Sequence, residues 1–187
     1  MPDPEFLLLG DALWLEFINT AKSPPNGRDT LPDPAAWLRW TKAVRVEAPV
    51  SAAAFREAME VRGRLVSMAI ALEAGRSPPP SAIATVNGRL RGLDGREQLV
   101  RIAGTWQVRF VPGRSPTALE AVARSVGETL SNPVVVIRRC ANPACGLFFA
   151  DGSPHLSRRW CGRTGCGQRG NVERRRTSRP APLLAET

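Results

Sequence analysis

Four cysteines in the last third of the sequence are its clearest candidates for chemistry. They form two Cys-x4-Cys pairs separated by fifteen residues: Cys140, Cys145, Cys161 and Cys166. Two such pairs let two turns each supply two thiolates to a tetrahedral zinc ion. A disulfide framework would rarely confine all its cysteines to 27 residues. Because four thiolates leave no open position for water, we predict one structural Zn²⁺ ion and no hydrolytic centre.

The residues around the cysteines suit this interpretation. Glycines follow Cys145, Cys161 and Cys166, and glycine lets backbone N–H groups turn toward sulfur. His155 is the only histidine and lies between the two pairs, so it is an alternative ligand. Its place after the turn-forming Asp-Gly-Ser-Pro sequence favours a surface position instead.

The positive charge of the chain is concentrated around the cysteines. Residues 138–187 hold 10 Arg against 3 acids, a net +7, whereas residues 1–137 hold 16 Lys and Arg against 14 acids, a net +2. Such a field favours an anionic partner, and we expect DNA; RNA is the alternative, although the finger has few aromatic residues for stacking on bases. The candidate contacts are Arg158, Arg159, Gln168, Arg169, Arg174, Arg175 and Arg176. Two alternatives are that these arginines offset the charge of the zinc thiolates or form a solvated tail.

Periodicity and turn residues predict the elements that must position these groups. Apolar spacing and caps predict five helices, over 12–20 (capped by Asp11), 34–44, 51–74 (ended by Gly75), 81–92 (capped by Ser81) and 116–130. Residues 98–102 and 105–111 alternate around Ala103-Gly104 as a β-hairpin does, and 134–137 is extended. The predicted fold is mainly α with a small β-hairpin: a helical domain over 1–132, a zinc-ribbon or treble-clef-like finger over 133–179, and a flexible tail over 180–187.

Arg62 is the unusual residue of the helical domain. It falls within the apolar stripe of the helix predicted over 51–74, where an uncompensated charge is costly. It therefore needs an anionic partner. The alternatives are an internal carboxylate such as Glu16, or a bound anionic ligand.

Several classes of protein are disfavoured. No stretch reaches the roughly 20 apolar residues of a membrane span, and the N-terminus lacks the basic start of a signal peptide, so we expect a cytoplasmic protein without membrane contact. With one histidine and all cysteines assigned to zinc, little remains for catalysis, and we do not expect an enzyme.

Two segments resemble a known family. The segment from Cys140 to Arg169, with Leu-Phe-Phe-Ala-Asp-Gly-Ser and Ser-Arg-Arg-Trp between the cysteine pairs, is similar to the CGNR zinc finger of bacterial ABATE-domain proteins. Gly-Asp-Ala-Leu-Trp-Leu-Glu-Phe-Ile-Asn-Thr at 10–20, Arg28-Asp29 and Trp-Leu-Arg-Trp at 37–40 resemble the opening of that family. Here Cys-Gly-Gln-Arg at 166–169 replaces Cys-Gly-Asn-Arg, so Gln168 stands where the family has asparagine.

The resemblance implies a function as well as a fold. ABATE proteins are described as stress-induced transcription regulators, which implies a ligand-sensing helical domain joined to a DNA-binding finger. The positions matching family residues in the helical domain are Asn19, Thr20, Arg62 and Asn87. The competing hypothesis is a small-molecule or partner-binding protein in which the zinc finger is only a structural staple.

Overall fold

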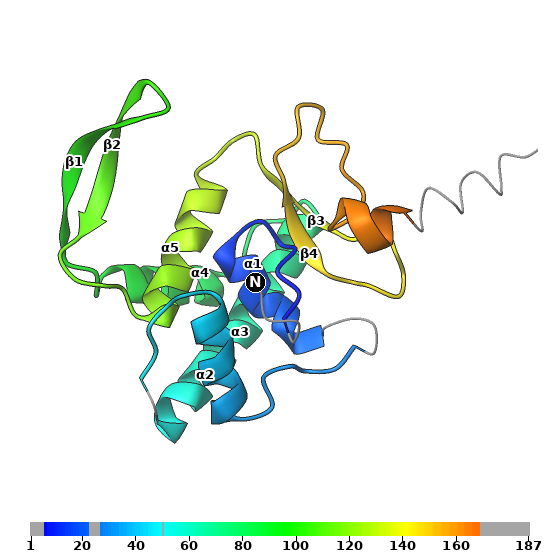
Figure 1. The fold of residues 1–187 in the computed structure, drawn as a ribbon, viewed down its shortest axis with the longest axis horizontal. Coiled ribbons are helices and arrows are strands. Elements are labelled where there is room, and N and C mark those ends of the chain that lie inside the picture. Colours follow the sequence, from blue (N-terminus) through cyan, green and yellow to red (C-terminus); the bar gives the residue numbers. More distant parts are fainter. Residues whose placement is uncertain (1–5, 23–26, 50, 169–187) are drawn as a thin grey trace, which may run out of the picture.

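The computed structural model describes residues 6–22, 27–49 and 51–168, which form a helical body with two antiparallel hairpins (Figure 1). The mainly α prediction is confirmed, but the sequence indicated only the first hairpin. The second forms because the extended segment before Cys140 pairs with residues 148–151. The elements are α1 Leu13–Asn19, α2 Pro34–Ala43, α3 Ala52–Glu73, α4 Pro80–Leu90, β1 Gly95–Ile102, β2 Thr105–Pro112, α5 Ala118–Leu130, β3 Val136–Arg139 and β4 Phe148–Asp151.

Aromatic residues of α1 and α2 form the centre of the helical core. The ring of Phe17 lies 5.4 Å from Trp37 and 5.2 Å from Trp40, and the two indoles stack at 5.3 Å. The apolar stripe of α3 packs against this cluster, with Leu65 and other stripe residues buried. Burial of these large side chains supplies most of the driving force for folding the helical body.

The caps of α3 agree with the sequence. The Ser51 hydroxyl accepts a hydrogen bond from the backbone N–H of Ala54 at the first turn. At the other end Gly75 has a φ of +67°, and the backbone N–H of Arg76 bonds back to the carbonyl of Ala71 at 2.8 Å. This αL ending is the one that glycine favours.

Two other predicted caps are wrong. The N-cap of α1 is Ala12, and Asp11 has a φ of +64° and presents its carboxylate to the finger instead. Helix α4 begins at Pro80, one residue before the predicted cap Ser81, because proline at the first helical position already has a helical φ and needs no hydrogen-bonded N–H.

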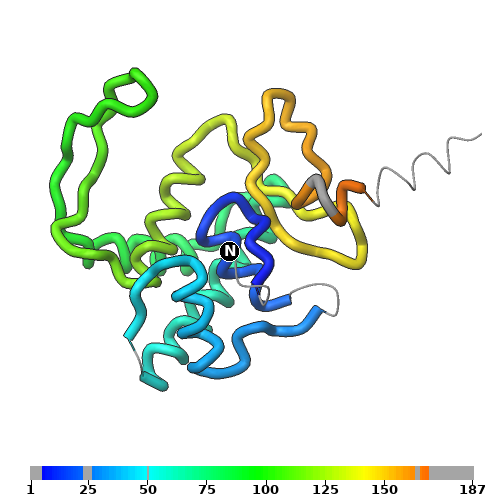
Figure 2. Tube along the Cα trace, in the orientation of Figure 1, coloured from blue at the N-terminus to red at the C-terminus, as the bar shows by residue number. Residues whose placement is uncertain are grey.

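The β1–β2 hairpin projects away from the helices (Figure 2). Ala103 and Gly104 form its turn with φ of +48° and +85°, the left-handed pair that a two-residue hairpin turn uses. Its base is fixed by Arg114, whose guanidinium donates to both oxygens of the buried Glu120 carboxylate at 2.8 and 2.6 Å.

The β3–β4 hairpin joins the helical body to the cysteine cluster. Consecutive residues of β4 face opposite sides, so Phe148 packs in the helical core while Phe149 packs among the cysteines. Arg139 in β3 stacks over the ring of Phe148 at 4.4 Å. One short strand therefore contributes to both cores. In the described part of the chain, no helix is long and apolar enough to cross a membrane.

Candidate metal centre and the surface around it

The turn between β3 and β4 supplies the first cysteine pair. The backbone N–H of Cys140 donates to the carbonyl of Leu147 at 2.8 Å, which closes the hairpin across the turn. Within the turn the backbone N–H of Cys145 donates to the carbonyl of Asn142 at 2.9 Å. Gly146 has a φ of +70°, a conformation that brings the chain from the second thiol back into β4.

The second cysteine pair lies at a single π-helical turn, Arg163–Gly167. Cys166 lies within this turn and Cys161 lies two residues before it. The side-chain amide of Asn142 donates to the Cys166 sulfur at 3.3 Å, so the first turn supports a thiolate of the second. The backbone N–H of Ala141 donates to the carbonyl of Arg159 at 2.8 Å and ties the two segments together.

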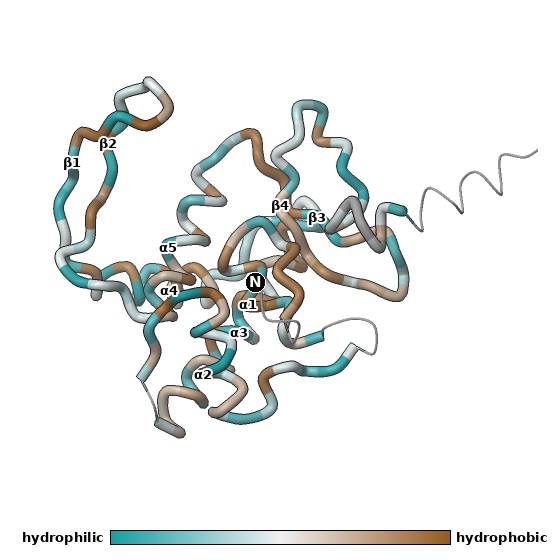
Figure 3. The backbone as a smooth tube through the Cα atoms, in the orientation of Figure 1, coloured by the Kyte–Doolittle hydropathy of each residue, from teal (hydrophilic) through white to brown (hydrophobic). Residues whose placement is uncertain are grey.

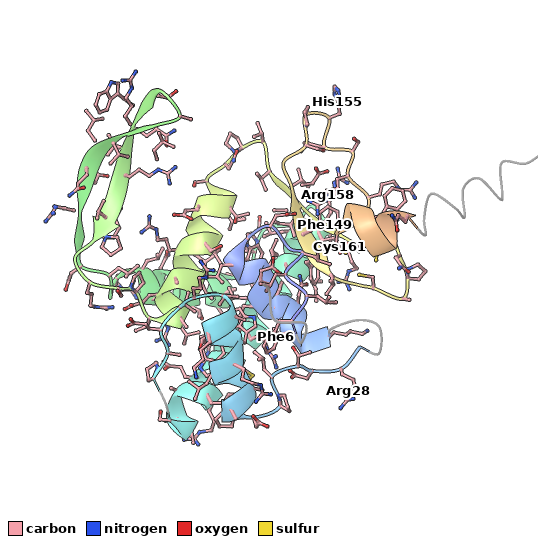
Figure 4. All side chains as sticks on the ribbon, viewed as in Figure 1. Phe6, Arg28, Phe149, His155, Arg158 and Cys161 are labelled. Carbon is pink, nitrogen blue, oxygen red and sulfur yellow. The ribbon has the colours of Figure 1, made fainter. Side chains whose placement is uncertain are left out.

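The four sulfur atoms fit one zinc ion. All lie within 4.8 Å of one another, and those of Cys145 and Cys161 are 3.6 Å apart. Zn–S bonds of about 2.3 Å in a tetrahedron place sulfurs about 3.8 Å apart. Three of the cysteines are buried and Cys166 is half-buried. His155 is exposed at the tip of the loop after β4 and is not part of this group (Figure 4). The arrangement of the four sulfurs confirms the prediction of one structural zinc held by four cysteines.

The proton affinities of the thiols show why a cation belongs here. A hydrogen bond from Cys161 is the main cause that lowers the pKa of Cys145 to about 5, against the opposing effect of burial. The hydrogen bond with Cys145, together with burial and the neighbouring thiolates, raises the pKa of Cys161. Ionisation of one thiol in the cluster is therefore favoured, and ionisation of further thiols is opposed by repulsion between thiolates. A divalent cation removes that repulsion and lets all four ionise.

Asp151, which the sequence analysis did not single out, organises the loop next to the zinc site. Its side chain is fully buried and accepts hydrogen bonds from Arg138 Nε at 2.8 Å, from the Ser153 hydroxyl at 2.6 Å and from the backbone N–H of Arg158 at 3.1 Å. Burial raises its pKa, but these donors outweigh that effect and hold the pKa below its usual range. The Asp-Gly-Ser-Pro turn was the signal that could have identified it.

Arg158, one of the predicted nucleic-acid contacts, is engaged within the protein. Its guanidinium lies 4.6 Å from the ring of Phe149, donates to the carbonyl of Trp160 at 2.9 Å and also to the carbonyl of Cys161. It forms an ion pair with Asp11, which lies just before α1. Arg158 therefore fixes the finger against the helical body.

The other predicted contacts fall into two groups. Arg159 and Gln168 are exposed on the finger, and the Arg159 guanidinium lies 5.4 Å from the ring of Trp160. Arg159 and Trp160 border an open groove of about 910 Å³ that also includes Ser153 and Ser157. Arg169, Arg174, Arg175 and Arg176 lie outside the described residues.

The predicted ligand residues of the helical domain mostly satisfy one another. Arg62 donates to Thr20 Oγ1 at 3.0 Å and to Asp29 Oδ1 at 2.8 Å, and it forms a two-pronged ion pair with that carboxylate. An internal carboxylate is thus present, but it is Asp29 and not Glu16. The internal-carboxylate alternative is therefore confirmed and only the example Glu16 is wrong, because the loop before α2, whose shape the sequence did not specify, brings Asp29 over α3.

Asn19 and Asn87 do not share one site. Asn19 is buried, and its amide exchanges two hydrogen bonds of 2.9 Å with the backbone of Phe148 in β4. Asn87 is exposed on α4. A ligand-sensing site in the helical domain would need its family-matching positions close together, but Arg62, Asn19 and Asn87 do not form one buried polar site, because the outward face of α4 carries Asn87 into solvent.

Glu16 does not pair with Arg62 but binds the backbone just before α1. Its carboxylate accepts the backbone N–H groups of Leu9 at 3.0 Å and Gly10 at 2.8 Å, and so orders the segment that leads into α1. The carbonyl of Gly10 in turn accepts from the backbone N–H of Ala150 in β4 at 2.9 Å. Burial is the main cause that raises the pKa of Glu16 to about 7, although the backbone donors oppose it.

Comparison with known proteins agrees with this architecture. A family model named ABATE and described as "Putative stress-induced transcription regulator" matches residues 11–133, and a model named CGNR zinc finger matches residues 137–179. No curated protein matches the chain. The first match covers the helical body and the second covers the cysteine cluster with both of its pairs. The chain therefore belongs to the ABATE family and carries a CGNR zinc finger after its helical domain.

Proposed function

We propose that this protein is a DNA-binding transcription regulator whose finger contacts the phosphate backbone through Arg159 and the arginines that follow Cys166. The observation that carries the proposal is the exposed Arg159 beside the finger groove. Within residues 6–22, 27–49 and 51–168, Arg159 has no acidic partner at ion-pair distance, whereas Arg138, Arg139 and Arg158 each have one. An arginine left unneutralised in a segment of net charge +7 favours a phosphate partner.

The chemistry of the groove supports the same partner. Ser153 and Ser157 line it together with Arg159, and hydroxyl, backbone N–H and guanidinium groups are the usual donors to phosphate oxygens. Gln168 is exposed at the end of the π-helical turn, and its amide could pair with adenine in a major groove. Zinc would hold both segments at a fixed separation, and its closed shell leaves it no catalytic role. We therefore propose no enzymatic activity.

For the helical body the contacts support positioning of the finger more than ligand sensing. Asn19 bonds the backbone of β4, and Asp11 pairs with Arg158. A ligand that acted on the DNA-binding surface would have to alter these contacts. Because Arg62 and Thr20 already satisfy each other and Asp29, they leave little for a bound anion to do.

One observation favours the alternative, a finger that serves only as a structural staple. Arg138, Arg139 and Arg158 neutralise Asp151, Glu73 and Asp11, so much of the described charge of the finger is used internally. In that case Arg159 would be a solvated surface residue without a nucleic-acid partner.

Fluorescence anisotropy with a labelled duplex, titrated at several salt concentrations, distinguishes the two. With four to five phosphate contacts, the logarithm of affinity should fall against the logarithm of salt with a slope of about −4. Arg159→Ala should weaken binding to all duplexes alike and flatten that slope by about 1, and replacing Arg174, Arg175 and Arg176 together should flatten it further.

Arg64→Ala is the matched control, because Arg64 is an exposed arginine on α3 that bonds only Thr85 among the described residues. Gln168→Ala separates base reading from backbone binding, since loss of a base contact changes the preference between sequences. No detectable binding at low salt, or binding that ignores both Arg159→Ala and the triple substitution, would support the staple.

A further inference from the structure

We propose that the β1–β2 hairpin is a dimerisation arm that packs face to face against the same hairpin of a second copy of this chain. The hairpin extends from the helical body with its tip far from the finger (Figure 1). The inference concerns a surface that the proposed DNA contact does not use, and it stands or falls independently of that contact.

One face of the hairpin is apolar and uncovered. Three directly opposed pairs lie on it, and from base to tip they are Glu97–Phe110, Leu99–Val108 and Arg101–Trp106. Leu99, Trp106 and Val108 expose 65%, 62% and 63% of their surface. Hydrophobic segments recur along this arm, which stands apart from the helices (Figure 3).

Such a face calls for a protein partner. A two-stranded hairpin by itself is marginally stable in water, and contiguous exposed apolar surface marks an interaction site. The face carries one glutamate and one arginine and is therefore neutral, which disfavours the phosphate backbone of a nucleic acid. Burying the Leu99 and Val108 side chains would supply the hydrophobic driving force.

The order of the three pairs makes the face complementary to itself. When a second copy is placed antiparallel across a twofold axis, the central Leu99–Val108 pair meets its own copy. The outer pairs exchange places, so Arg101 meets Glu97 of the second copy and Trp106 meets Phe110. Each charge then faces its opposite and the aromatic rings pair, as a twofold interface requires of a single patch. A different partner would have no reason to follow this reversed order.

The body of the protein leaves room for the incoming tip. An open groove of about 650 Å³ lies between the hairpin and α5, lined by Leu90, Leu93, Phe110, Arg124 and Glu128 among others. Arg124 reaches to 6.0 Å from the Phe110 ring and pairs with Glu128 at 2.9 Å. Val108 and Phe110 belong to both the groove lining and the apolar face, so the two form one continuous surface.

Light scattering coupled to size exclusion tests the proposal on the full zinc-loaded chain. The wild-type protein is expected to elute with twice the mass of one chain at micromolar concentration. Leu99→Glu places a charge at the centre of the face and should yield a monomer with unchanged zinc content and helical circular dichroism. Arg96→Glu is the control, because it also introduces a glutamate, with an even larger change of charge, but on the opposite face of β1, and it should leave the dimer intact.

Charge exchange tests the antiparallel arrangement directly. Glu97→Arg and Arg101→Glu should each weaken self-association about tenfold or more, because like charges then face each other twice per dimer. The double variant should recover the wild-type affinity, and an equimolar mixture of the two single variants should form heterodimers.

Three results would overturn the proposal. A monomeric wild-type protein at high micromolar concentration excludes the dimer. A dimer insensitive to Leu99→Glu or to charge exchange uses another surface. A monomer whose affinity for duplex DNA falls with Arg101→Glu assigns the hairpin to nucleic acid instead.

Discussion

The side-chain amide of Asn19 in α1 pairs with the backbone of Phe148 in β4: Nδ2 donates to the carbonyl oxygen and Oδ1 accepts the N–H, both at 2.9 Å. The two hydrogen bonds join residues that are 129 positions apart and extend the edge of β4 as a strand neighbour would. They place the strand that ends the first zinc turn directly on the helical core.

Removal of this amide should destabilise the whole chain. We expect Asn19→Leu to lower the free energy of unfolding by about 2–4 kcal/mol, because it leaves a buried backbone N–H and carbonyl without partners. Asn87→Ala is the control from the same set of family positions; its side chain is exposed, so its effect should stay within about 0.5 kcal/mol. Urea denaturation measures both. Equal effects at the two positions would contradict the structural role of Asn19.

The Arg62–Asp29 pair should respond unequally to loss of its two members. The Arg62 side chain is 9% exposed and that of Asp29 is 42% exposed, so removing the carboxylate leaves a buried cation whereas removing the arginine leaves an acid that can meet water. We expect Asp29→Asn to cost roughly 2 kcal/mol, and Arg62→Met less. The double variant should match Arg62→Met within about 0.5 kcal/mol. Additive losses in a thermal or urea double-mutant cycle would show that the two residues do not depend on each other.

The raised pKa of Glu16 predicts a stability that falls with rising pH. The carboxyl titrates near 4.5 in the unfolded chain and near 7 in the folded protein, so between these values the folded state binds more protons. Its contribution is therefore complete below pH 4.5 and is lost as pH rises through 7, by up to about 3 kcal/mol. Glu16→Gln should remove this loss between pH 5 and pH 8. Urea titrations at several pH values measure it, and parallel profiles for the two proteins would refute the assignment.

Zinc removal should unfold the finger while leaving much of the helical body in place. Leu147, Phe149 and Cys161 are buried around the sulfurs, and a core this small is not stable without the metal. We expect one zinc per chain by elemental analysis, and an altered Trp160 fluorescence with little change in helical circular dichroism after strong chelation. Cys145→Ala should reproduce the chelated state.

Two results would contradict this prediction for the zinc site. If chelation abolished the helical signal, the two cores would fold as one cooperative unit. A zinc content below about half an equivalent in protein purified without chelators would contradict the four-cysteine site.

Local and periodic features of this chain could be predicted from its amino-acid order. Cysteine spacing identified the four metal ligands because tetrahedral coordination depends on residue type and short turns. Apolar periodicity located the five helices, and Gly75 marked the end of the longest, because these signals act within a few residues. The two caps that failed did so at helix starts where Ala12 and Pro79 precede the first turn without offering a side-chain hydrogen bond.

The partners of the polar residues, in contrast, depend on how distant segments pack together. The sequence shows Arg62 as a charge within an apolar stripe. Its ion pair with Asp29, and not with Glu16, depends on the path of a loop that no local rule specifies. Arg158 turns inward and pairs with Asp11, whereas Arg159 is exposed. This difference arises because neighbouring side chains alternate in direction along a segment that packs against the start of α1. Hydrogen bonds and ion pairs between distant segments follow from packing, and packing is set by the whole core rather than by any stretch of the sequence.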